Sequence, residues 1–377
     1  MPERIRVATM IDSLSPENLG GGERLAALIA MHLDPERFDR LLVSSRPSTG
    51  PLREQVEQSG VKLLALERGG KADLTAWREL VGFLRRERVD VLHAHKFGSN
   101  VWGTVVGRIA RVPVIVAHEH TWSYEGQPLR KALDGLVVGR GADVFLAVSR
   151  EDRRRMIELE HVPAARARYL PIGIEPPPPR TGRDLRAELG IPAGAPVIGT
   201  VCALRPQKRL DVLLDAAVLL AREFPDLHVV IAGAGPEREL LLAREVENVH
   251  LLGFWPPADV PDLLAALDVA VNSSDFEGSP LGIMEFMAQG RPVVATSVGG
   301  TPDLIDDGIH GLLVRRRDPG ALAAAVARLL RDPELRERLG EAGRKRQAAE
   351  FDVRALVRRL EALYVELLAK KRRIRST

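Results

Sequence analysis

The sequence predicts an α/β protein with two doubly wound domains, in each of which helices cover both faces of a parallel sheet. Short runs rich in Val and Ile alternate with longer segments of helical periodicity through most of the chain. These runs lack the strict alternation that a strand with one solvated face shows, so they fit strands buried on both faces. The length of 377 residues also suits two domains of ordinary size better than one.

The expected strands fall into two groups of about five. The first group covers residues 5–11, 41–45, 89–93, 114–117 and 144–148. The second group covers residues 197–201, 229–232, 249–252, 269–272 and 293–296. Amphipathic helices are expected between the strands, as at residues 23–33 and 210–223.

Residues 175–183, EPPPPRTGR, mark the boundary between the domains. Four consecutive prolines continue neither a helix nor a central strand, so this segment is expected to be a stiff connector. The sequence thus predicts an N-terminal domain at 1–175 and a C-terminal domain at 176–352. A last helix at about 353–377 either belongs to the C-terminal domain or crosses back and packs on the N-terminal one.

The composition is that of a globular protein and disfavours several classes of function. Aromatic residues make up 4% of the chain, too few for a platform that stacks single-stranded nucleic acid. The single cysteine, Cys202, excludes an internal disulfide framework and suits a reducing compartment. No uncharged apolar run approaches the ~18 residues of a membrane span, and the apolar start of the chain is too short for a signal peptide. We therefore expect a cytoplasmic protein that binds no nucleic acid.

The net charge of +3 hides an uneven distribution. Residues 354–377 hold eight Lys or Arg and two Glu, a charge of +6, which leaves −3 for the rest of the chain. Leucines recur at helical spacing in this segment before the basic run KKRRIR. One interpretation, which we prefer, is a helix packed on the core with a solvated basic tail. The other is a helix end that contacts anionic lipid at the inner face of a membrane.

The segment SSDFEGSPLGIMEFMAQGRPVVATSVGG, residues 273–300, is the most informative in the chain. Its two glutamates, Glu277 and Glu285, are separated by seven residues, and a helix start is expected between them. Ser279 is a suitable N-cap, and Pro280 suits the first helical position because its missing N–H costs nothing there.

This arrangement predicts an anion site between two carboxylates. The free amides of Leu281 and Gly282 point out of the helix start and suit a phosphate. Glu277 lies in the loop before the helix, and Glu285 lies about one turn inside it. Two carboxylates that bracket a phosphate suit the hydroxyls of a nucleotide sugar.

Segments that follow other expected strands are candidates too, because ligands of open parallel sheets bind beyond the carboxyl ends of the strands. Arg205 and Lys208 lie in one turn and suit a diphosphate, although an ordinary basic loop has the same composition. Gly233 and Gly235 lie between a strand and a helix, a pattern that is common in nucleotide-binding folds and weakly specific. Backbone amides near Phe254 either read a base edge or form a structural turn.

In the N-terminal half, Gly20, Gly21 and Gly22 open a helix expected near residue 23. Bare backbone there allows a ligand to approach closely, and a tight turn is an equal alternative. The spacing is not G-x-G-x-x-G, so a dehydrogenase is disfavoured. The chain also contains neither G-x-x-x-x-G-K-[ST] nor D-x-D. The first absence argues against an NTPase loop, and the second argues against a metal-dependent nucleotide-sugar enzyme of the single-domain type.

Four histidines lie at two other expected strand ends. His93 and His95 follow one strand, and His118 and His120 end another. Alternation places His118 and His120 on the same side of an extended chain. A metal site would need a third ligand, for which the other pair is the source, and no spacing in the sequence specifies it. For each histidine, a structural hydrogen bond and a place in a ligand-binding cleft are equal interpretations.

Taken together, these segments resemble glycosyltransferase family 4, the group 1 glycosyltransferases, whose GT-B architecture has two Rossmann-like domains facing across a cleft. The matching elements are GGGER, VCALRPQK, GAGPE, the glutamate pair and RPVVATSVGGTPDLIDDGIHGLLV. The resemblance covers most of the chain and is strongest at residues 196–315. The glutamate pair with the run G-R-P-V-V-A-T is specific, whereas each other element alone is not.

The resemblance implies a nucleotide-diphosphate sugar bound against the C-terminal domain. Lys208 would contact its diphosphate, Glu277 its sugar and Glu285 its ribose. Further contacts with the donor would come from Gly235, Phe254, Gly278, Leu281 and Gly282. Gly21 and Gly22 would close over the donor from the other domain.

The resemblance further implies transfer of the sugar with retention of configuration, as in polysaccharide biosynthesis, with no metal or other cofactor. The acceptor would be a glycan, a lipid-linked molecule or a small molecule, and its determinants are expected in N-terminal loops that include residues 122–130. Two alternatives remain: a nucleotide-sugar epimerase and a non-catalytic nucleotide-sugar-binding protein.

The chain departs from the family pattern at two places that concern the site. The G-R that commonly stands before the lysine is Cys202-Ala203 here, and Arg205 is the candidate that supplies the missing charge. His118 and His120 straddle the usual place of a histidine in the cleft, and the local sequence H-T-W favours His120.

Overall fold

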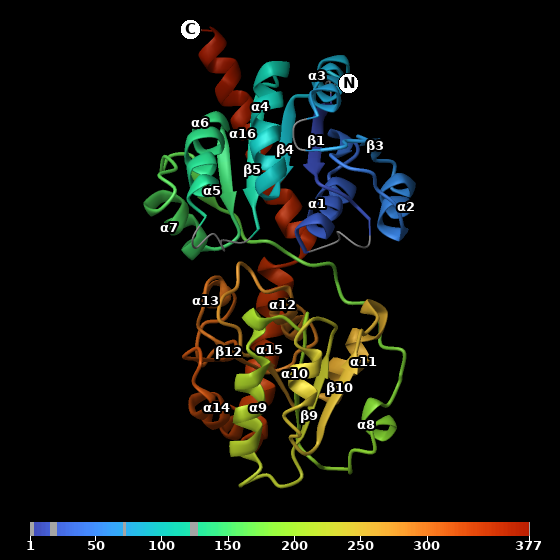
Figure 1. Cartoon of the computed structure of the whole chain (residues 1–377), viewed down its shortest axis with the longest axis vertical. Coiled ribbons are helices and arrows are strands. Elements are labelled where there is room, and N and C mark those ends of the chain that lie inside the picture. Colours follow the sequence, from blue (N-terminus) through green and yellow to red (C-terminus); the bar gives the residue numbers. More distant parts are fainter. Residues whose placement is uncertain (1–3, 16–20, 71–72, 121–126, 377) are drawn as a thin grey trace. The chain divides into compact units, whose positions relative to one another are not determined.

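The computed structural model describes residues 4–15, 21–70, 73–120 and 127–376. The chain divides into two compact units, one formed by Met1–Gly173 with Val353–Thr377 and the other by Ile174–Asp352. They are referred to below as the N-terminal unit and the C-terminal unit (Figure 1). The proline-rich segment at 175–183 contains no helix or strand, as expected, and the division falls just before it.

The N-terminal unit contains a parallel sheet of seven strands in the order β3-β2-β1-β4-β5-β6-β7. The strands are β1 Ile5–Ile11, β2 Phe38–Ser44, β3 Lys62–Ala65, β4 Val91–His95, β5 Val114–Glu119, β6 Val144–Ala147 and β7 Ala167–Tyr169. The helices are α1 Gly21–His32, α2 Pro51–Gln58, α3 Leu74–Arg86, α4 Lys96–Ala110, α5 Pro128–Leu133, the π-helix η2 Asp134–Val138, α6 Gly139–Gly141, α7 Arg150–Glu158 and α16 Val353–Ser376.

The C-terminal unit contains a parallel sheet of six strands in the order β10-β9-β8-β11-β12-β13. The strands are β8 Val197–Val201, β9 His228–Ala232, β10 Val249–Gly253, β11 Val269–Asn272, β12 Val293–Thr296 and β13 Leu312–Val314. The helices are α8 Leu185–Glu188, η3 Pro206–Lys208, α9 Leu210–Leu220, α10 Arg238–Leu242, η4 Pro257–Asp259, α11 Val260–Ala266, α12 Leu281–Ala288, α13 Thr301–Leu304, α14 Pro319–Arg331 and α15 Pro333–Glu350.

In each sheet, strands are added first to one side of the initial strand and then to the other side, and this reversal of the strand order confirms the predicted fold class. The first strand of each sheet lies inside it, the next two strands extend to one side, and the fourth pairs on the other side. The reversal falls between β1 and β4 in the N-terminal unit and between β8 and β11 in the C-terminal unit. Ligands of doubly wound folds bind beyond the carboxyl ends of the strands at such a point.

The expected strands are all present, and three short strands were not expected. β3 and β7 are the two edges of the first sheet, and β13 is an edge of the second. Edge strands pair on one side only and are often short, so their hydrophobic signal is weak. β4 ends at His95 rather than at residue 93, so both histidines lie within the strand instead of following it.

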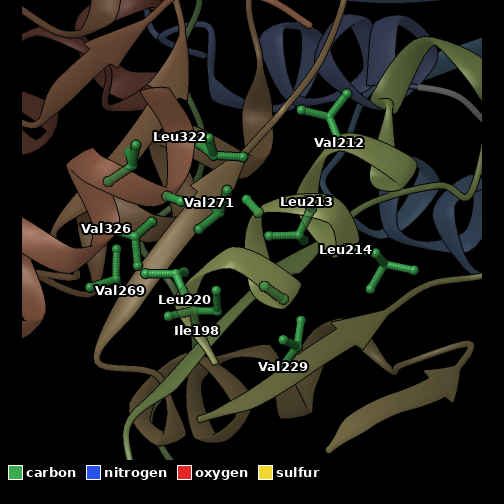
Figure 2. Packing of buried hydrophobic residues seen from close by; sticks show 14 of the residues in the cluster. Ile198, Val212, Leu213, Leu214, Leu220, Val229, Val269, Val271, Leu322 and Val326 are labelled. Carbon is green, nitrogen blue, oxygen red and sulfur yellow. The ribbon is translucent and has the colours of Figure 1, made fainter. Parts of the chain in front are cut away.

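The core of the C-terminal unit lies between its sheet and the helices α9 and α14 (Figure 2). Ile198, Val229 and Val269 come from strands, Leu220 from α9 and Val326 from α14, and each is at most 3% exposed. Full burial of one such side chain contributes roughly 1.5–3 kcal/mol. This packing fixes β8 and β11, whose carboxyl ends carry the residues described below.

The last helix, α16, belongs to the N-terminal unit, so the chain crosses back after residue 352. Its leucines are buried in that unit: Leu356, Leu360, Leu363, Leu367 and Leu368. The Asp34 amide donates to Glu361 Oε1 at 2.9 Å, and Lys371 near the basic end pairs with Asp143 at 2.6 Å. The helix therefore packs on a core, which confirms the packing part of the preferred interpretation. Among the described helices, none combines the length and the hydropathy that crossing a membrane requires.

Candidate active site

Lys208 and Glu277 meet at the point where the strand order of the C-terminal sheet reverses, between β8 and β11. Lys208 ends the short helix η3 after β8, and Glu277 lies in the loop after β11. Lys208 Nζ donates to Glu277 Oε1 at 2.6 Å, and the two side chains are 18% and 8% exposed. Two residues that the sequence analysis selected separately thus form one partly buried ion pair.

One oxygen of Glu277 holds the carboxylate in place and leaves the other available. Besides Lys208, Ser274 Oγ donates to Oε1 at 2.6 Å and Asn272 Nδ2 donates to it at 3.3 Å. Oε2 accepts no hydrogen bond from the described residues. An ammonium group has three donors, so Lys208 also keeps two after its bond to Glu277. The pair is fixed in space and still has capacity for a ligand.

The backbone around Glu277 is held by two neighbouring loops, the turn after β8 and the loop after β12. The Asp275 amide donates to Gln207 O at 2.8 Å, which joins the loop after β11 to the turn after β8. The Gly300 amide donates to Glu277 O at 3.1 Å. Gly299 has φ of 50°, and a Cβ there would lie 1.8 Å from Glu277 O. Only glycine fits at position 299 because the Glu277 carbonyl occupies that space.

The helix after Glu277 begins one position later than expected. α12 starts at Leu281, and Pro280 precedes it with ψ of 106°, outside the helical region. The Pro280 carbonyl accepts from the Ile283 amide at 3.1 Å. The prediction of Ser279 as N-cap and of Pro280 as first helical residue is therefore wrong. The proline ring fixes φ but leaves ψ free to be extended, so Pro280 can stand just outside the helix.

The amides predicted to bind an anion still stand at the start of this helix. Leu281 and Gly282 are its first two residues, whose amides have no acceptor within the helix. Gly278 is buried directly after Glu277, and Glu285 lies partly buried on α12 itself. The two glutamates therefore flank the helix start as the sequence indicated.

The basic turn after β8 contains one exposed arginine and one that is neutralised. Arg205 is exposed and makes no side-chain hydrogen bond with the described residues. Arg209 instead pairs with Asp211 at 2.7 Å and with Asp275 at 3.2 Å, and Arg317 also pairs with Asp275. Burial alone would raise the pKa of Asp275, but the hydrogen bonds from Arg317 and Arg209 lower it overall. Arg209 is a structural residue, and Arg205 is free to meet an anion.

The glycine loop after β9 packs directly on the turn that carries Lys208. A Cβ on Gly233 would lie 1.7 Å from Cys202 O, and one on Gly235 would lie 2.3 Å from Leu204 O. Burial raises the pKa of the Cys202 thiol to about 11, so this side chain is neutral at pH 7. Phe254 follows β10 at the same end of the sheet, with 74% of its surface exposed. Gly235 therefore has a structural reason to be glycine besides any contact with a ligand.

In the N-terminal unit, the four histidines gather beside the reversal point of the first sheet. His93, His95 and His118 lie in β4 and β5 and are buried, whereas His120 follows β5 and is half-buried. His95 Nδ1 and His120 Nε2 are 3.0 Å apart, and His93 Nδ1 is 2.7 Å from Tyr364 Oη on α16. Burial lowers the pKa of all four rings, that of His118 to about 3.

The geometry supplies the third histidine that a metal site would need. Nitrogens of His93, His95 and His118 lie within 4.8 Å of one another. No carboxylate or thiolate among the described residues belongs to the group. A divalent ion held there would have only neutral ligands from the described residues.

His120, and not His118, borders the first turn of α1. The helix begins at Gly21, and a Cβ on Gly22 would lie 3.1 Å from His120 Cγ and 3.1 Å from Lys96 Cδ. Lys96, whose φ is 69°, forms an ion pair with the buried Glu23. The missing side chain of Gly22 thus allows α1 to approach His120 and Lys96 closely. Gly20 and residues 121–126, which include most of the expected acceptor loop, lie outside the described residues.

Several residues of the two sites were not selected from the sequence. Asn272 is the last residue of β11, Ser274 lies two residues after it, and Lys96 directly follows β4, so their positions at strand ends were the available signal. Tyr364 had no such signal, because it lies 271 residues from the histidine that it contacts.

Comparison with known proteins gives the same result for both halves of the chain. The family described as Glycosyltransferase Family 4 matches residues 19–176, and Glycosyl transferases group 1 matches residues 182–346. A D-inositol 3-phosphate glycosyltransferase of Thermobispora bispora is 33% identical over 328 residues, which cover 78% of this chain and 76% of the relative. An alpha-D-kanosaminyltransferase of Streptomyces kanamyceticus is 30% identical over 307 residues, which cover 75% and 79%.

Solved structures share the fold over nearly the whole chain. Anabaena Alr3699/HepE in complex with UDP superposes with a TM-score of 0.83 at 22% identity, covering 96% of this chain and all of that one. The same protein in complex with UDP-glucose gives a TM-score of 0.80 at 23% identity, covering 97% of this chain. Fold and relatives together define a glycosyltransferase enzyme with two Rossmann-like domains of the GT-B type. The chain belongs to glycosyltransferase family 4, the group 1 glycosyl transferases, as its sequence predicted.

Proposed function

We propose that this enzyme is a retaining glycosyltransferase that moves a sugar from a nucleotide-diphosphate sugar to an acceptor hydroxyl without a bound metal. The observation that carries the proposal is the Lys208–Glu277 pair at the reversal point of the C-terminal sheet. One carboxylate oxygen is anchored by three donors, and the other accepts from none of the described residues. A related fold holds UDP and UDP-glucose in Anabaena HepE, which supports a nucleotide-sugar donor.

In this proposal each group of the C-terminal unit has one task. The remaining donors of Lys208 bind the diphosphate, together with the first amides of α12. Glu277 Oε2 accepts from a hydroxyl of the sugar, and Glu285 accepts from the ribose. Arg205 supplies the positive charge that the family's arginine, absent here at the position of Ala203, commonly provides. Amides near Gly235, Phe254 and Gly278 complete the contacts with the donor.

The reaction breaks the bond between the anomeric carbon and the diphosphate oxygen, and the electron pair leaves with the diphosphate. The acceptor oxygen bonds to the anomeric carbon from the same face, which retains the configuration. A phosphate oxygen of the donor takes the acceptor proton. Lys208 and the helix amides stabilise the leaving charge, and preorganised donors of this kind lower the barrier most.

The alternative functions make different demands on the same residues. An epimerase would release a changed nucleotide sugar without any acceptor, and a binding protein would need no leaving-group stabilisation. The relatives named above are transferases, which favours transfer. For the acceptor, the D-inositol 3-phosphate named in one relative is the first compound to test, followed by glycan and lipid-linked acceptors. We also propose that the enzyme is cytoplasmic and that the basic end of α16 touches anionic lipid.

The test combines a donor panel with substitutions at the pair. We expect Lys208→Ala and Glu277→Ala to lower transfer at least about 100-fold, because each removes a group that acts on the leaving diphosphate or the sugar. Lys345→Ala, at a site 72% exposed, is the matched control and should leave the rate unchanged. NMR of the product should show the anomeric configuration of the donor, and EDTA should not change the rate.

Two results would contradict the proposal. Inversion of the anomeric centre would exclude the same-face mechanism. Donor binding without turnover across the whole acceptor panel, with equal binding by the Lys208→Ala variant, would favour the non-catalytic alternative.

A further inference from the structure

The ring nitrogens of the four histidines in the N-terminal unit make two hydrogen bonds, one to Tyr364 and one within the group. His93 Nδ1 bonds with Tyr364 Oη at 2.7 Å, and His95 Nδ1 bonds with His120 Nε2 at 3.0 Å. The ring centroid of His118 lies 5.4 Å from that of His93 and 4.7 Å from that of His120. The second bond is the informative one, because it joins a buried residue to a half-buried one.

Both rings of that bond are neutral at pH 7. Burial lowers the pKa of His95 and of His120 well below the usual value, and charge on the neighbouring rings would lower it further. The nearby Lys96 lowers the pKa of His120 in the same direction. A neutral imidazole has one N–H and one lone-pair nitrogen, so one ring of the pair donates and the other accepts. The direction of the bond therefore fixes both tautomers.

The surroundings of His95 favour one direction. His95 Nε2 is buried and has no partner among the described residues. If His95 accepted at Nδ1, its proton would sit on Nε2 as a buried N–H without an acceptor, and such orphaned donors are rare and cost about 1–3 kcal/mol. If His95 donates from Nδ1, only a lone pair is left at Nε2. The second arrangement leaves no orphaned donor on this ring.

The contacts of His120 leave a single side of its ring for a ligand. The Cγ and Cδ2 edge faces Gly22, where a Cβ would lie 3.1 and 3.3 Å from these atoms. Nε2 is taken by His95. Nδ1 bonds with none of the described residues, and the residue is half-buried. Nδ1 is thus the ring nitrogen that is left to bond with a ligand.

We propose that His95 is a positioning residue that holds His120 in the tautomer with its proton on Nδ1, so that His120 presents an N–H donor to a substrate oxygen. This inference rests on the proposed function, because it assigns His120 to the same reaction. His120 is then a donor of a hydrogen bond and not a general base, since its lone pair is used by His95. That role agrees with a mechanism in which the donor phosphate takes the acceptor proton.

The tautomer can be observed directly in the full-length enzyme. Histidine is labelled with ¹⁵N in the ring, and long-range ¹H–¹⁵N correlation spectra distinguish a protonated from an unprotonated ring nitrogen. The His120→Asn variant identifies the signals of His120. We expect its Nδ1 to be protonated and its Nε2 to be a hydrogen-bonded acceptor. A proton on Nε2 in the wild-type enzyme would overturn the proposal, and no substrate is needed for this result.

Two substitutions of equal shape separate positioning from packing. Asparagine at position 95 places an amide N–H near the original Nδ1, whereas aspartate places an acceptor there. We expect His95→Asn to keep the Nδ1 proton of His120 and nearly full activity. We expect His95→Asp to move that proton to Nε2 or to charge the ring, and to lower kcat/KM by about tenfold, the equivalent of one hydrogen bond.

The remaining outcomes are also decisive. Equal loss of activity in both variants with an unchanged His120 tautomer would mean that His95 only fills space, which overturns the proposal. If His95→Asp fails to fold, the wild-type spectrum and the His95→Asn variant still decide. A spectrum that changes on addition of EDTA would show that a metal ion fixes the ring instead. Nδ1 protonation without any transfer across the acceptor panel would contradict the proposed function and leave the tautomer assignment standing.

Discussion

Asp134, in the π-helix η2, is a carboxyl group buried in the N-terminal unit. Neither of its oxygens accepts a hydrogen bond from the described residues. Burial raises its pKa to about 9, with a further contribution from the neighbouring Glu119 and Glu160. The folded protein therefore keeps a proton on Asp134 that the unfolded chain releases near pH 4. Because the folded state binds the extra proton, stability falls as the pH rises from about 4 to about 9.

Replacing this residue by its neutral isostere should remove that loss. We expect Asp134→Asn to have a higher free energy of unfolding than the wild type at pH 8, and the difference should shrink towards pH 4. Urea unfolding at several pH values measures it. Asp226→Asn, at an exposed site, is the control and should not change the slope. A difference that stays constant with pH would mean that Asp134 is ionised in the folded protein.

Single residues also show how far a sequence specifies a site. Lys208 and Glu277 were selected by their chemistry and their place after strands, and both lie at the reversal point of the sheet. Their bond to each other was not foreseen, because it depends on the neighbouring positions of β8 and β11. Gly299 gave no signal of its own, since its need for φ of 50° comes from the carbonyl of Glu277. Contacts of this kind are three-dimensional, and spacing along the chain does not encode them.

Among the elements, α16 has the most consequences for the site. Its leucines predicted a packed helix, but the helical spacing did not decide which unit it covers. The structure places Tyr364, which is fully buried, against His93 of β4.

The edge strands β3, β7 and β13 were missed for a related reason, because their pairing comes from a neighbour and not from a strong apolar run.

Removing the hydroxyl of Tyr364 tests the contact between α16 and the sheet. We expect Tyr364→Phe to destabilise the N-terminal unit by about 1–3 kcal/mol, because His93 Nδ1 loses its buried partner while the ring packing is kept. Thermal or urea unfolding measures the loss. Val365→Ala, on the exposed side of the same helix, is the control and should leave the stability unchanged. Unchanged stability would show that His93 does not depend on this bond.

At the scale of the whole molecule, the distribution of charge sets one feature apart. The chain carries +6 in residues 354–377 and −3 elsewhere. The described side chains at Lys370, Arg372 and Arg373 are exposed, whereas Lys371 is partly buried in its pair with Asp143. The fold was predicted in full outline, since the two doubly wound units follow from apolar runs and from the prolines between them.

Deleting residues 370–377 tests the proposed contact with lipid. We expect weaker partitioning onto vesicles that contain anionic lipid, because each basic residue near such a surface contributes about 1 kcal/mol. Neutral vesicles and high salt are the controls, and neither should support binding by the full chain. Equal partitioning of the full and the shortened chain would assign the basic end to solvent.

The division of the chain also dictates an order of events during synthesis. The C-terminal unit is one continuous stretch, Ile174–Asp352, inserted between two pieces of the N-terminal unit. The ribosome therefore synthesises all of the C-terminal unit before it makes the helix that completes the N-terminal unit. Until Val353–Ser376 emerges, the first sheet lacks the leucines of α16, and His93 lacks Tyr364. The N-terminal unit is thus begun first and completed last. A truncated product that stops before residue 353 contains the whole C-terminal unit and an N-terminal unit without α16.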